Sequence, residues 1–311
     1  MLARNGLAKK KKNAYGIPRT MPEKVFDLLN VVLMIFLMFI TFYPFWNQVV
    51  MSIAPVSDLY KATPVIFPSG FNPGPFEVIF SYNPIWIGYR NTLIISIAST
   101  ALTVVVTFFA GYPLSKPDLP FYGFFSKTLT CTMLFGGGLI PAYLLIRSLG
   151  WLNTYWALIV PGCLSAYNIF LVRNYIKTLP KELEESALID GAGQLRILLQ
   201  IIMPLSMPIL ATIALWKFVG EWQAWYSCLL YIDDASKQTL GLVARKILVD
   251  SDLAALRNSA MSFTSDSTGF GVDTKQLTAG VIVVTVAPML VVYPFFQKYF
   301  VKGIVIGAIK G

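Results

Sequence analysis

The sequence predicts an all-α membrane protein with six transmembrane helices. Of the 311 residues, 56% are hydrophobic and only 13% are charged, and the mean hydropathy is +0.63. Soluble domains carry about 25% charged residues, so this composition is typical of a chain that crosses a lipid bilayer several times. The charged residues are also absent from long stretches, and these stretches locate the individual helices.

Five stretches contain no Asp, Glu, Lys or Arg and hold the ~20 apolar residues that a spanning helix needs. In chain order they are Leu28–Ser57, Asn91–Ser115, Thr128–Ile146, Ser148–Val172 and Gln276–Gln297. One further span, Ile209–Ile232, which is the fifth in chain order, is interrupted by Lys217 and Glu221. Two charge-poor stretches between residues 62 and 89 are excluded, because their prolines and glycines interrupt a spanning helix.

The positive residues predict the orientation. Sixteen of the 25 Lys and Arg residues fall in segments that are cytoplasmic if the N-terminus is inside, and eight fall in the external segments. Both termini are therefore predicted to be cytoplasmic, with the Lys9–Lys12 run as a membrane anchor rather than a nucleic-acid site.

The spans and the orientation predict four segments along the chain. They are a basic cytoplasmic segment (1–25), a first transmembrane helix with an external loop (26–90), a transmembrane core (91–300) and a cytoplasmic tail (301–311). The core contains a cytoplasmic loop at about 179–204 and an external loop at about 233–275. In the external loop, Leu240–Leu256 has helical apolar spacing, and predicts a helix either on the outer membrane surface or packed onto neighbouring spans.

Several enzyme classes are excluded by the residue types. The chain has no histidine, which excludes Ser-His-Asp and Cys-His catalysis and His-ligated metal sites. Cys131, Cys163 and Cys228 lie in apolar stretches without metal-ligand spacing, so we interpret them as core residues rather than disulfides. The sequence has no phosphate-binding Gly-rich loop of the Gly-x-x-x-x-Gly-Lys-Ser/Thr type. We therefore expect no catalytic residue, no metal and no cofactor, and an energy source outside this chain.

The cytoplasmic loop is too polar to span the membrane and has the pattern of a short surface helix followed by a turn. Pro180 suits a helix start, and Glu182, Glu184 and Glu185 follow in the first turns, where carboxylates favour the positive helix end. Gly191 supplies the stop. A second helix is expected to run from there into the membrane.

This loop resembles the EAA loop of ATP-binding-cassette (ABC) importer permeases. In that pattern Glu-Ala-Ala is followed by Gly four residues later, and by Ile-x-Leu-Pro after nine more. Ser186 and Met203 depart from it, and the matching residues are Glu185, Ala187, Gly191, Ile201 and Pro204.

The resemblance implies a type I ABC importer permease fold, in which Glu182–Gly193 forms a coupling helix that docks into a groove on a cytoplasmic ATPase subunit. Its small residues Ser186 and Ala187 would allow close approach. The residues implied in coupling are Glu182, Glu185, Ser186, Ala187, Asp190, Gly191, Ala192, Ile201 and Pro204. The alternative is an ordinary amphipathic connector with acidic residues in water.

Four further segments look like carbohydrate-importer permeases of the maltose-permease type, in particular the lipoprotein-associated complex-sugar permeases of Gram-positive bacteria. They are Gly137–Pro141, Leu149–Thr154, Pro180–Glu185 and Phe300–Gly303. The resemblance implies a plasma-membrane subunit that forms half of a sugar path. Its implied partners are a second homologous permease, two ATPase subunits and an external solute-binding lipoprotein. The alternatives are an ABC permease for amino acids, peptides or another small solute, and an autonomous secondary transporter.

Cargo contacts are expected among intramembrane polar and aromatic residues, which are unfavourable in lipid. The expected fifth span is the densest source, with Trp216, Lys217, Glu221, Trp222, Gln223, Trp225 and Tyr226. Aromatic rings stack on sugar rings, and amide or carboxylate groups bind hydroxyls. Lys217 and Glu221 lie four residues apart, so they either contact cargo or neutralise each other.

In the expected third span, Gly136, Gly137 and Gly138 followed by Pro141 predict a weakened helix in the middle of the membrane. Irregular backbone at that depth occurs only where protein or a water-filled cavity satisfies it. The segment is therefore either a broken helix beside the translocation path or a site of close helix packing through small residues.

Overall fold

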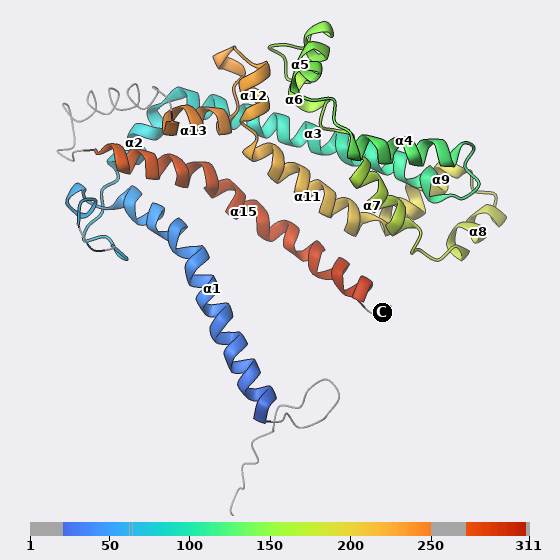
Figure 1. The fold of residues 1–311 in the computed structure, drawn as a ribbon, viewed down its shortest axis with the longest axis horizontal. Coiled ribbons are helices and arrows are strands. Elements are labelled where there is room, and N and C mark those ends of the chain that lie inside the picture. The colour runs from blue at the N-terminus through green and yellow to red at the C-terminus, as the bar shows by residue number, and fades with distance from the viewer. Residues whose placement is uncertain (1–20, 62, 64, 250–271, 309–311) are drawn as a thin grey trace, which may run out of the picture.

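The computed structural model describes residues 21–61, 63, 65–249 and 272–308. Across these ranges the chain is helical and contains no β-strand, which confirms the all-α fold class (Figure 1). The predicted basic run at Lys9–Lys12 and the end of the external loop, 250–271, lie outside the described residues.

Three helices are much longer than the rest: α1 (Met21–Ile53), α3 (Asn83–Ser115) and α15 (Thr274–Ala308). Each contains a stretch long and apolar enough to cross a membrane. α3 begins eight residues before the predicted span, because Pro84 occupies its first turn, where a missing N–H costs no hydrogen bond. α15 continues beyond the predicted end at Gln297.

Not every predicted span is an uninterrupted helix that could cross a membrane, and the break considered at the glycine run of the third span is present. The described part of the chain has three such helices, or five if each of two bent pairs is one span. In one pair, α4 (Tyr122–Leu134) and α5 (Leu139–Ser148) meet at 115° across four non-helical residues. In the other, Gln194–Leu205 and α11 (Met207–Gln223) meet at 73°. The second helix of the predicted cytoplasmic loop therefore does not run straight into the fifth span.

The predicted fourth span, Ser148–Val172, is likewise not one helix. It contains the single turn α6 (Trp156–Ile159) and most of α7 (Ala166–Ile176), separated by non-helical residues. Two residues before α6 have left-handed backbone, Gly150 at φ 69° and Asn153 at φ 57°. Pro161 and Gly162 lie in the gap between α6 and α7, and both residue types disfavour a continuous helix.

The centre of the structure is α3, which packs against α7, α11 and α13 (Leu240–Val249). Small residues allow these close approaches. A Cβ atom built on Gly111 would lie 2.8 Å from Val172 of α7, and one on Gly88 would lie 2.9 Å from the backbone of Leu240. The buried face of α3 also carries short hydroxyl side chains, at Ser96, Ser99, Thr103 and Thr107. Small residues at helix interfaces are the usual device for packing in membranes.

Apolar clusters lie at the two ends of α3, which we call the α8 end and the α13 end. At the α8 end, Phe108, Val172 and Ile213 join residues from the loop at about 179–204. At the α13 end, Ile79, Leu240 and Val281 are fully buried. The stretch that begins at Leu240, predicted to be external, therefore packs onto the neighbouring helices through α13, at least as far as Val249.

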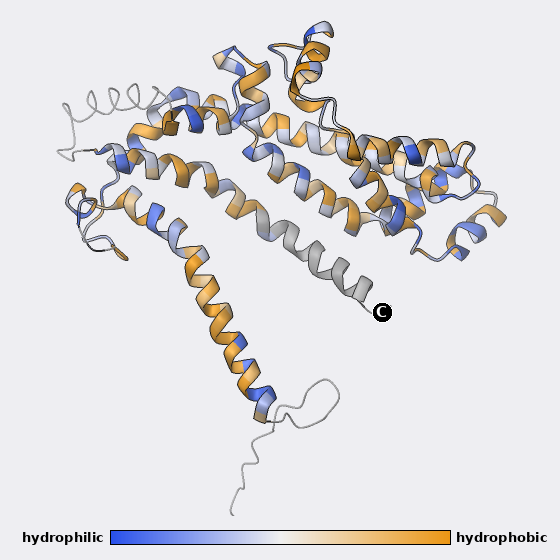
Figure 2. Cartoon of the chain, in the orientation of Figure 1, coloured by the Kyte–Doolittle hydropathy of each residue, from blue (hydrophilic) through white to orange (hydrophobic). Residues whose placement is uncertain are grey.

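α1 extends away from the other helices and contacts them mainly through α15 (Figure 1). Its most apolar window has no buried residue, and Figure 2 shows hydrophobic residues along most of its length. Short elements complete the α13 end; they are η1 (Val56–Asp58), α2 (Gly74–Ser81), α12 (Tyr226–Tyr231) and η3 (Ala235–Lys237).

Candidate functional site

The loop at about 179–204, predicted to be cytoplasmic, forms a short helix, a glycine turn and a second helix at one extremity of the molecule (Figure 1). The first helix is α8 (Glu182–Ile189), and its first turn contains the three carboxylates Glu182, Glu184 and Glu185. Gly191 has φ 77° and donates its N–H to Leu188 O at 3.0 Å, while Ala192 N donates to Ala187 O at 2.9 Å. This pair of bonds is the Schellman arrangement that ends a helix at a left-handed glycine.

The exposed face of α8 differs in one respect from the face expected for docking. Glu182, Glu185, Ser186 and Asp190 are exposed, and thus accessible to another subunit. The Ala187 side chain is only 9% exposed and joins the apolar cluster at the α8 end, so it faces its own chain. Ser186, but not Ala187, therefore lies on the outward face.

An apolar residue on α8 was missed by the sequence analysis. Ile189 is 87% exposed, the highest value among the large apolar residues described, although it follows an acidic helix. An isolated Ile at the end of a charged surface helix was the available signal. Such a side chain gains stability only when another surface covers it.

Beyond Gly193, the second helix is irregular. α9 (Gln194–Ile197) is followed by the π-helical turn η2 (Leu198–Ile202) and by α10 (Met203–Leu205). Pro204 lies in the first turn of α10 and lacks the N–H that would continue the helical bonds, which is consistent with the wider turn before it. Ile201 is half-buried against the apolar cluster at the α8 end, and thus anchors this segment.

A groove of about 1030 Å³ separates α8 from the connection between α3 and α4. Its lining is polar and of mixed charge, with Lys116, Asp118 and Lys181 beside Glu184 and Glu185. Lys116 forms an ion pair with Glu184 across one end of the groove. The groove thus leaves the side of α8 that faces this connection open, in addition to its exposed face.

On α11, the interrupted fifth span, Lys217 and Glu221 pair with each other at 2.6 Å, and their side chains are 14% and 15% exposed. Lys217 Nζ also donates to Gly162 O at 2.8 Å. Gly162 lies in the gap between α6 and α7, where helical bonding stops. The Lys217 side chain therefore joins α11 to this irregular backbone, and the mutual neutralisation weighed from the sequence occurs.

The aromatic residues expected on the cargo path have different environments. Trp222 is 3% exposed, belongs to the cluster at the α13 end, and donates its indole N–H to Thr285 O at 3.1 Å. It is a core residue in this chain. Trp225 lies under the Arg245 guanidinium, 3.7 Å from the ring centroid. Trp216, Gln223 and Tyr226 are exposed.

At the glycine run, the helix stops after Leu134 and resumes at Leu139. Gly136, Gly137 and Gly138 are exposed, and a Cβ atom on Gly136 or Gly137 would meet no heavy atom within 4 Å. The close packing weighed for this segment is therefore not made within the described chain. Pro141 lies in the first turn of α5, where proline is tolerated.

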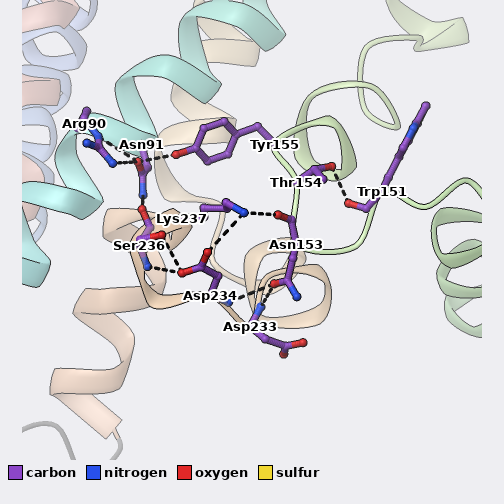
Figure 3. A network of polar contacts seen from close by, with 10 residues as sticks. All are labelled: Arg90, Asn91, Trp151, Asn153, Thr154, Tyr155, Asp233, Asp234, Ser236 and Lys237. Carbon is purple, nitrogen blue, oxygen red and sulfur yellow. Dashed lines mark hydrogen bonds and ion pairs between the residues drawn. The ribbon is translucent and has the colours of Figure 1, made fainter.

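Toward the α13 end of α3, a polar network joins three segments that are distant in sequence (Figure 3). Asn91 is fully buried, and its amide N–H groups donate to Ser236 O and Gln238 O, both at 2.9 Å. Its Oδ1 accepts a hydrogen bond from the Tyr155 hydroxyl at 2.8 Å. One buried amide thus holds α3, the start of α6 and the segment around η3 together.

Asn153 makes the second junction of this network (Figure 3). Its Oδ1 accepts from the N–H groups of Asp233 and Asp234, at 2.6 and 3.1 Å, and its carbonyl accepts from Lys237 Nζ at 2.9 Å. Hydrogen bonds from Ser236 hold the pKa of Asp234 below its usual value, which keeps this carboxylate ionised beside Lys237. The sequence analysis assigned no role to Asn91 or Asn153; polar residues within otherwise apolar stretches were the available signal.

Within the described residues, Cys, Asp and Glu side chains form no group of three or more that could hold a metal ion.

Comparison with known proteins relates the whole chain to one family. Residues 17–306 match the family model described as "Binding-protein-dependent transport system inner membrane component". The chain is 36% identical over 293 residues to the protein LplC of Bacillus subtilis strain 168, covering 94% of this chain and 97% of that protein. It is 33% identical to the polygalacturonan/rhamnogalacturonan transport system permease protein YtcP of the same organism, covering 94% and 100%.

A solved structure has the same architecture. It is a chain of a bacterial ABC transporter involved in the import of the acidic polysaccharide alginate, with a TM-score of 0.82 and 25% sequence identity. The match covers 91% of this chain and 99% of that one. The fold is therefore that of a type I ABC importer permease. From this architecture and the family match, the chain belongs to the binding-protein-dependent transport system inner membrane components, and is a multi-pass transport subunit of the plasma membrane rather than an enzyme.

Proposed function

We propose that this chain forms half of the translocation path of an ATP-driven importer for a sugar or oligosaccharide. It works with a second homologous permease, two cytoplasmic ATP-binding subunits and an external solute-binding lipoprotein. Both of its termini are cytoplasmic. The cargo class is supported by relatives described as permeases for polygalacturonan/rhamnogalacturonan and for arabinooligosaccharides. The alternative is another small solute carried by the same type of importer.

The observation that carries the proposal is the geometry of α8. This helix lies at the extremity of the molecule with Glu182, Glu185 and Ser186 exposed, and a left-handed Gly191 ends it abruptly. A short, well-capped helix presents a rigid shape to a partner at little cost in conformational entropy. We assign α8 as the coupling helix, with Glu182, Glu185, Ser186 and Asp190 as contacts to the ATPase and Ile189 as an apolar anchor.

The cargo contacts that fit a sugar best are the exposed groups near the end of α11. Tyr226 and Trp216 offer apolar ring faces, and the Gln223 amide can both donate to and accept from hydroxyls. Lys217 and Glu221 are engaged with each other and with Gly162, so they support the path rather than bind neutral cargo. The bend between α4 and α5 lies beside the path, since exposed irregular backbone at membrane depth requires a water-filled or protein-lined neighbour.

The decisive experiment is reconstitution of the chain into liposomes, with and without the ATP-binding subunits, the companion permease and the binding lipoprotein. Labelled oligogalacturonate, a neutral arabinooligosaccharide and a dipeptide serve as test solutes. We expect uptake of at least one saccharide only with all subunits and ATP. Uptake by this chain alone would overturn the proposal in favour of a secondary transporter, and ATP-dependent uptake of the dipeptide alone would overturn the sugar assignment.

A further inference from the structure

The two helices of the coupling loop are both tied to the same turn of α3. Lys116, the first residue after α3, forms an ion pair with Glu184 on α8. Tyr112, one turn earlier on α3, donates its hydroxyl hydrogen to Gln194 Oε1 of α9 at 3.1 Å. Glu184 and Gln194 lie on opposite sides of the Gly191 turn, so α3 holds both arms of the loop.

The two α3 residues also contact each other. Lys116 Nζ lies 4.9 Å from the centroid of the Tyr112 ring, which is a cation–π contact. The Tyr112 side chain is only 7% exposed and packs in the apolar cluster at the α8 end. A continuous chain of contacts therefore runs from Glu184 through Lys116 and Tyr112 to Gln194, and Tyr112 embeds it in the core.

α8 has few other attachments to the bundle. Ala187 is its only buried residue, and a single methyl group restrains position but not direction. Leu183, Leu188 and Ile189 are all exposed. A displacement of α8 must therefore reach the other helices through the Ala187 contact, the covalent chain, or the ion pair to Lys116. Of the two side-chain contacts, the ion pair is the directional one.

α3 is well placed to carry such a displacement across the molecule. It is one helix of 33 residues, in which Pro113 lacks the N–H for one helical bond near the C-terminal end. The remaining helical hydrogen bonds run along the axis, so the helix can transmit axial displacement. It packs on α7 and α11 along the way. Toward its other end, Asn91 holds the segments around Ser236 and Tyr155. Movement of α3 would thus act directly on the polar network around Asn91 at the α13 end.

We propose that Lys116 and Tyr112 are positioning residues that transmit movement of α8 to α3, and so couple the ATPase subunits to the far side of the permease. This inference rests on the proposed role of α8 as the coupling helix. It adds a specific route for the movement. The outward face of α8 would bind the ATPase subunit, and its inward face would transmit the movement to α3.

The test uses the complete complex in proteoliposomes, with the external solute-binding protein as purified from cells. The readout is the factor by which this binding protein stimulates ATP hydrolysis, together with the amount of ATP-binding subunit that copurifies with the permease. The variants are Lys116→Glu, Glu184→Lys and the double exchange. Lys116→Arg keeps the charge, and Lys127→Glu reverses a charge on exposed α4 surface as a matched control.

We expect each single reversal to retain the ATP-binding subunits and to lose about fivefold or more of the stimulation, the range of a typical allosteric coupling. The double exchange and Lys116→Arg should recover most of it, and Lys127→Glu should behave as wild type. Tyr112→Phe, which keeps the ring and removes the hydrogen bond to Gln194, should give a smaller loss. A merely structural role would lower yield without changing the stimulation factor.

Two results would overturn the inference: normal stimulation in the single reversals, or loss of the ATP-binding subunits in them without recovery in the double exchange. If the reversals do not accumulate in the membrane, Lys116→Gln supplies the same comparison with a smaller perturbation. Failure of the proposed function looks different, because wild-type complex would then show no stimulation by the binding protein. If the wild-type complex shows normal stimulation and all variants retain it, only the route through Lys116 and Tyr112 is rejected.

Discussion

Lys217 and Glu221 form a 2.6 Å ion pair one turn apart on α11, and both side chains are largely buried. A charge inside the bilayer is costly unless it is paired, so each residue depends on the other. Lys217 also reaches the Gly162 carbonyl, which the break between α6 and α7 leaves without a helical partner. This pair therefore stabilises the irregular region of the fold.

The first prediction concerns this pair. Lys217→Met should destabilise the purified protein by about 3–5 kcal/mol, because it leaves the Glu221 carboxylate buried and unpaired. The double variant Lys217→Met/Glu221→Gln should recover most of that loss, since no charge remains. Thermal unfolding in detergent measures both. Equal stabilities of the single and double variants would contradict the argument from pairing.

The second prediction concerns acid stability of the loop after α1. The Lys61 ammonium, followed by the Ser69 N–H and hydroxyl, lowers the pKa of Asp58 from 3.8 to about 2. Because the folded pKa is the lower one, the stabilisation is fully present above 3.8 and is lost as the pH falls from 3.8 to about 2. Fluorescence of Trp46, whose indole N–H donates to Ile66 O in this loop, should report the opening.

The control for this transition is Asp58→Asn. The amide cannot titrate, so the variant should show no change in Trp46 fluorescence over the same acid range. An unchanged acid transition in Asp58→Asn would assign the effect to another carboxylate.

The third prediction concerns the turn after α8. Gly191 has φ 77°, which costs a residue with a Cβ atom about 1–2 kcal/mol. Gly191→Val should therefore distort the end of α8 and abolish ATP-dependent uptake while the protein still accumulates in the membrane. Gly193→Ala is the matched control, since Gly193 has φ −69° and open space around a Cβ atom. Normal uptake in Gly191→Val would refute the coupling assignment.

The fourth prediction compares two helical glycines. Gly111→Ala would bring a Cβ atom to 2.8 Å from Val172, so we expect a loss of about 1–3 kcal/mol through overpacking between α3 and α7. Gly220→Ala on α11 meets no atom within 4 Å, and should instead stabilise the helix by up to about 1 kcal/mol. The sign of the change in unfolding midpoint distinguishes the two sites. A change of the same sign at both would contradict the packing of α3 on α7.

The fifth prediction separates core from cargo contact on α11. Trp222→Ala should cost about 3–5 kcal/mol of stability, because its ring is buried in the cluster at the α13 end. Gln223→Ala, at an exposed neighbouring position, should change stability by less than about 0.5 kcal/mol and raise the solute concentration for half-maximal uptake. Unchanged uptake in Gln223→Ala would remove this residue from the candidate path.

The helix and turn of the proposed coupling loop were predictable from sequence because their determinants are local. Carboxylates at the start of a helix and a glycine at its end act on the nearest backbone groups, and these lie within a few residues. The observed α8 and the Gly191 turn match that expectation. The direction of Ala187 did not follow from the same pattern, since a small residue suits an inward or an outward face equally.

The spans were predicted only in part. Absence of charge locates apolar segments, and α1, α3 and α15 appear where it places them. It does not report whether a segment is one helix, so the gap between α6 and α7 and the 73° bend before α11 were not foreseen. Trp222 illustrates the same limit. An aromatic residue in an apolar span gives the same sequence pattern whether it packs in the protein core or lines a translocation path.

Taken alone, the sequence determined the membrane environment, the helical class and the local shape of the coupling loop, since each depends on composition or on near neighbours. The tertiary structure decided the partners of Asn91 and Asn153, the pairing of Lys116 with Glu184 and the burial of Ala187 and Trp222. These contacts join residues far apart in the chain. They exist only once the helices have packed, because the angles of packing and not the spacing of residues bring the side chains together.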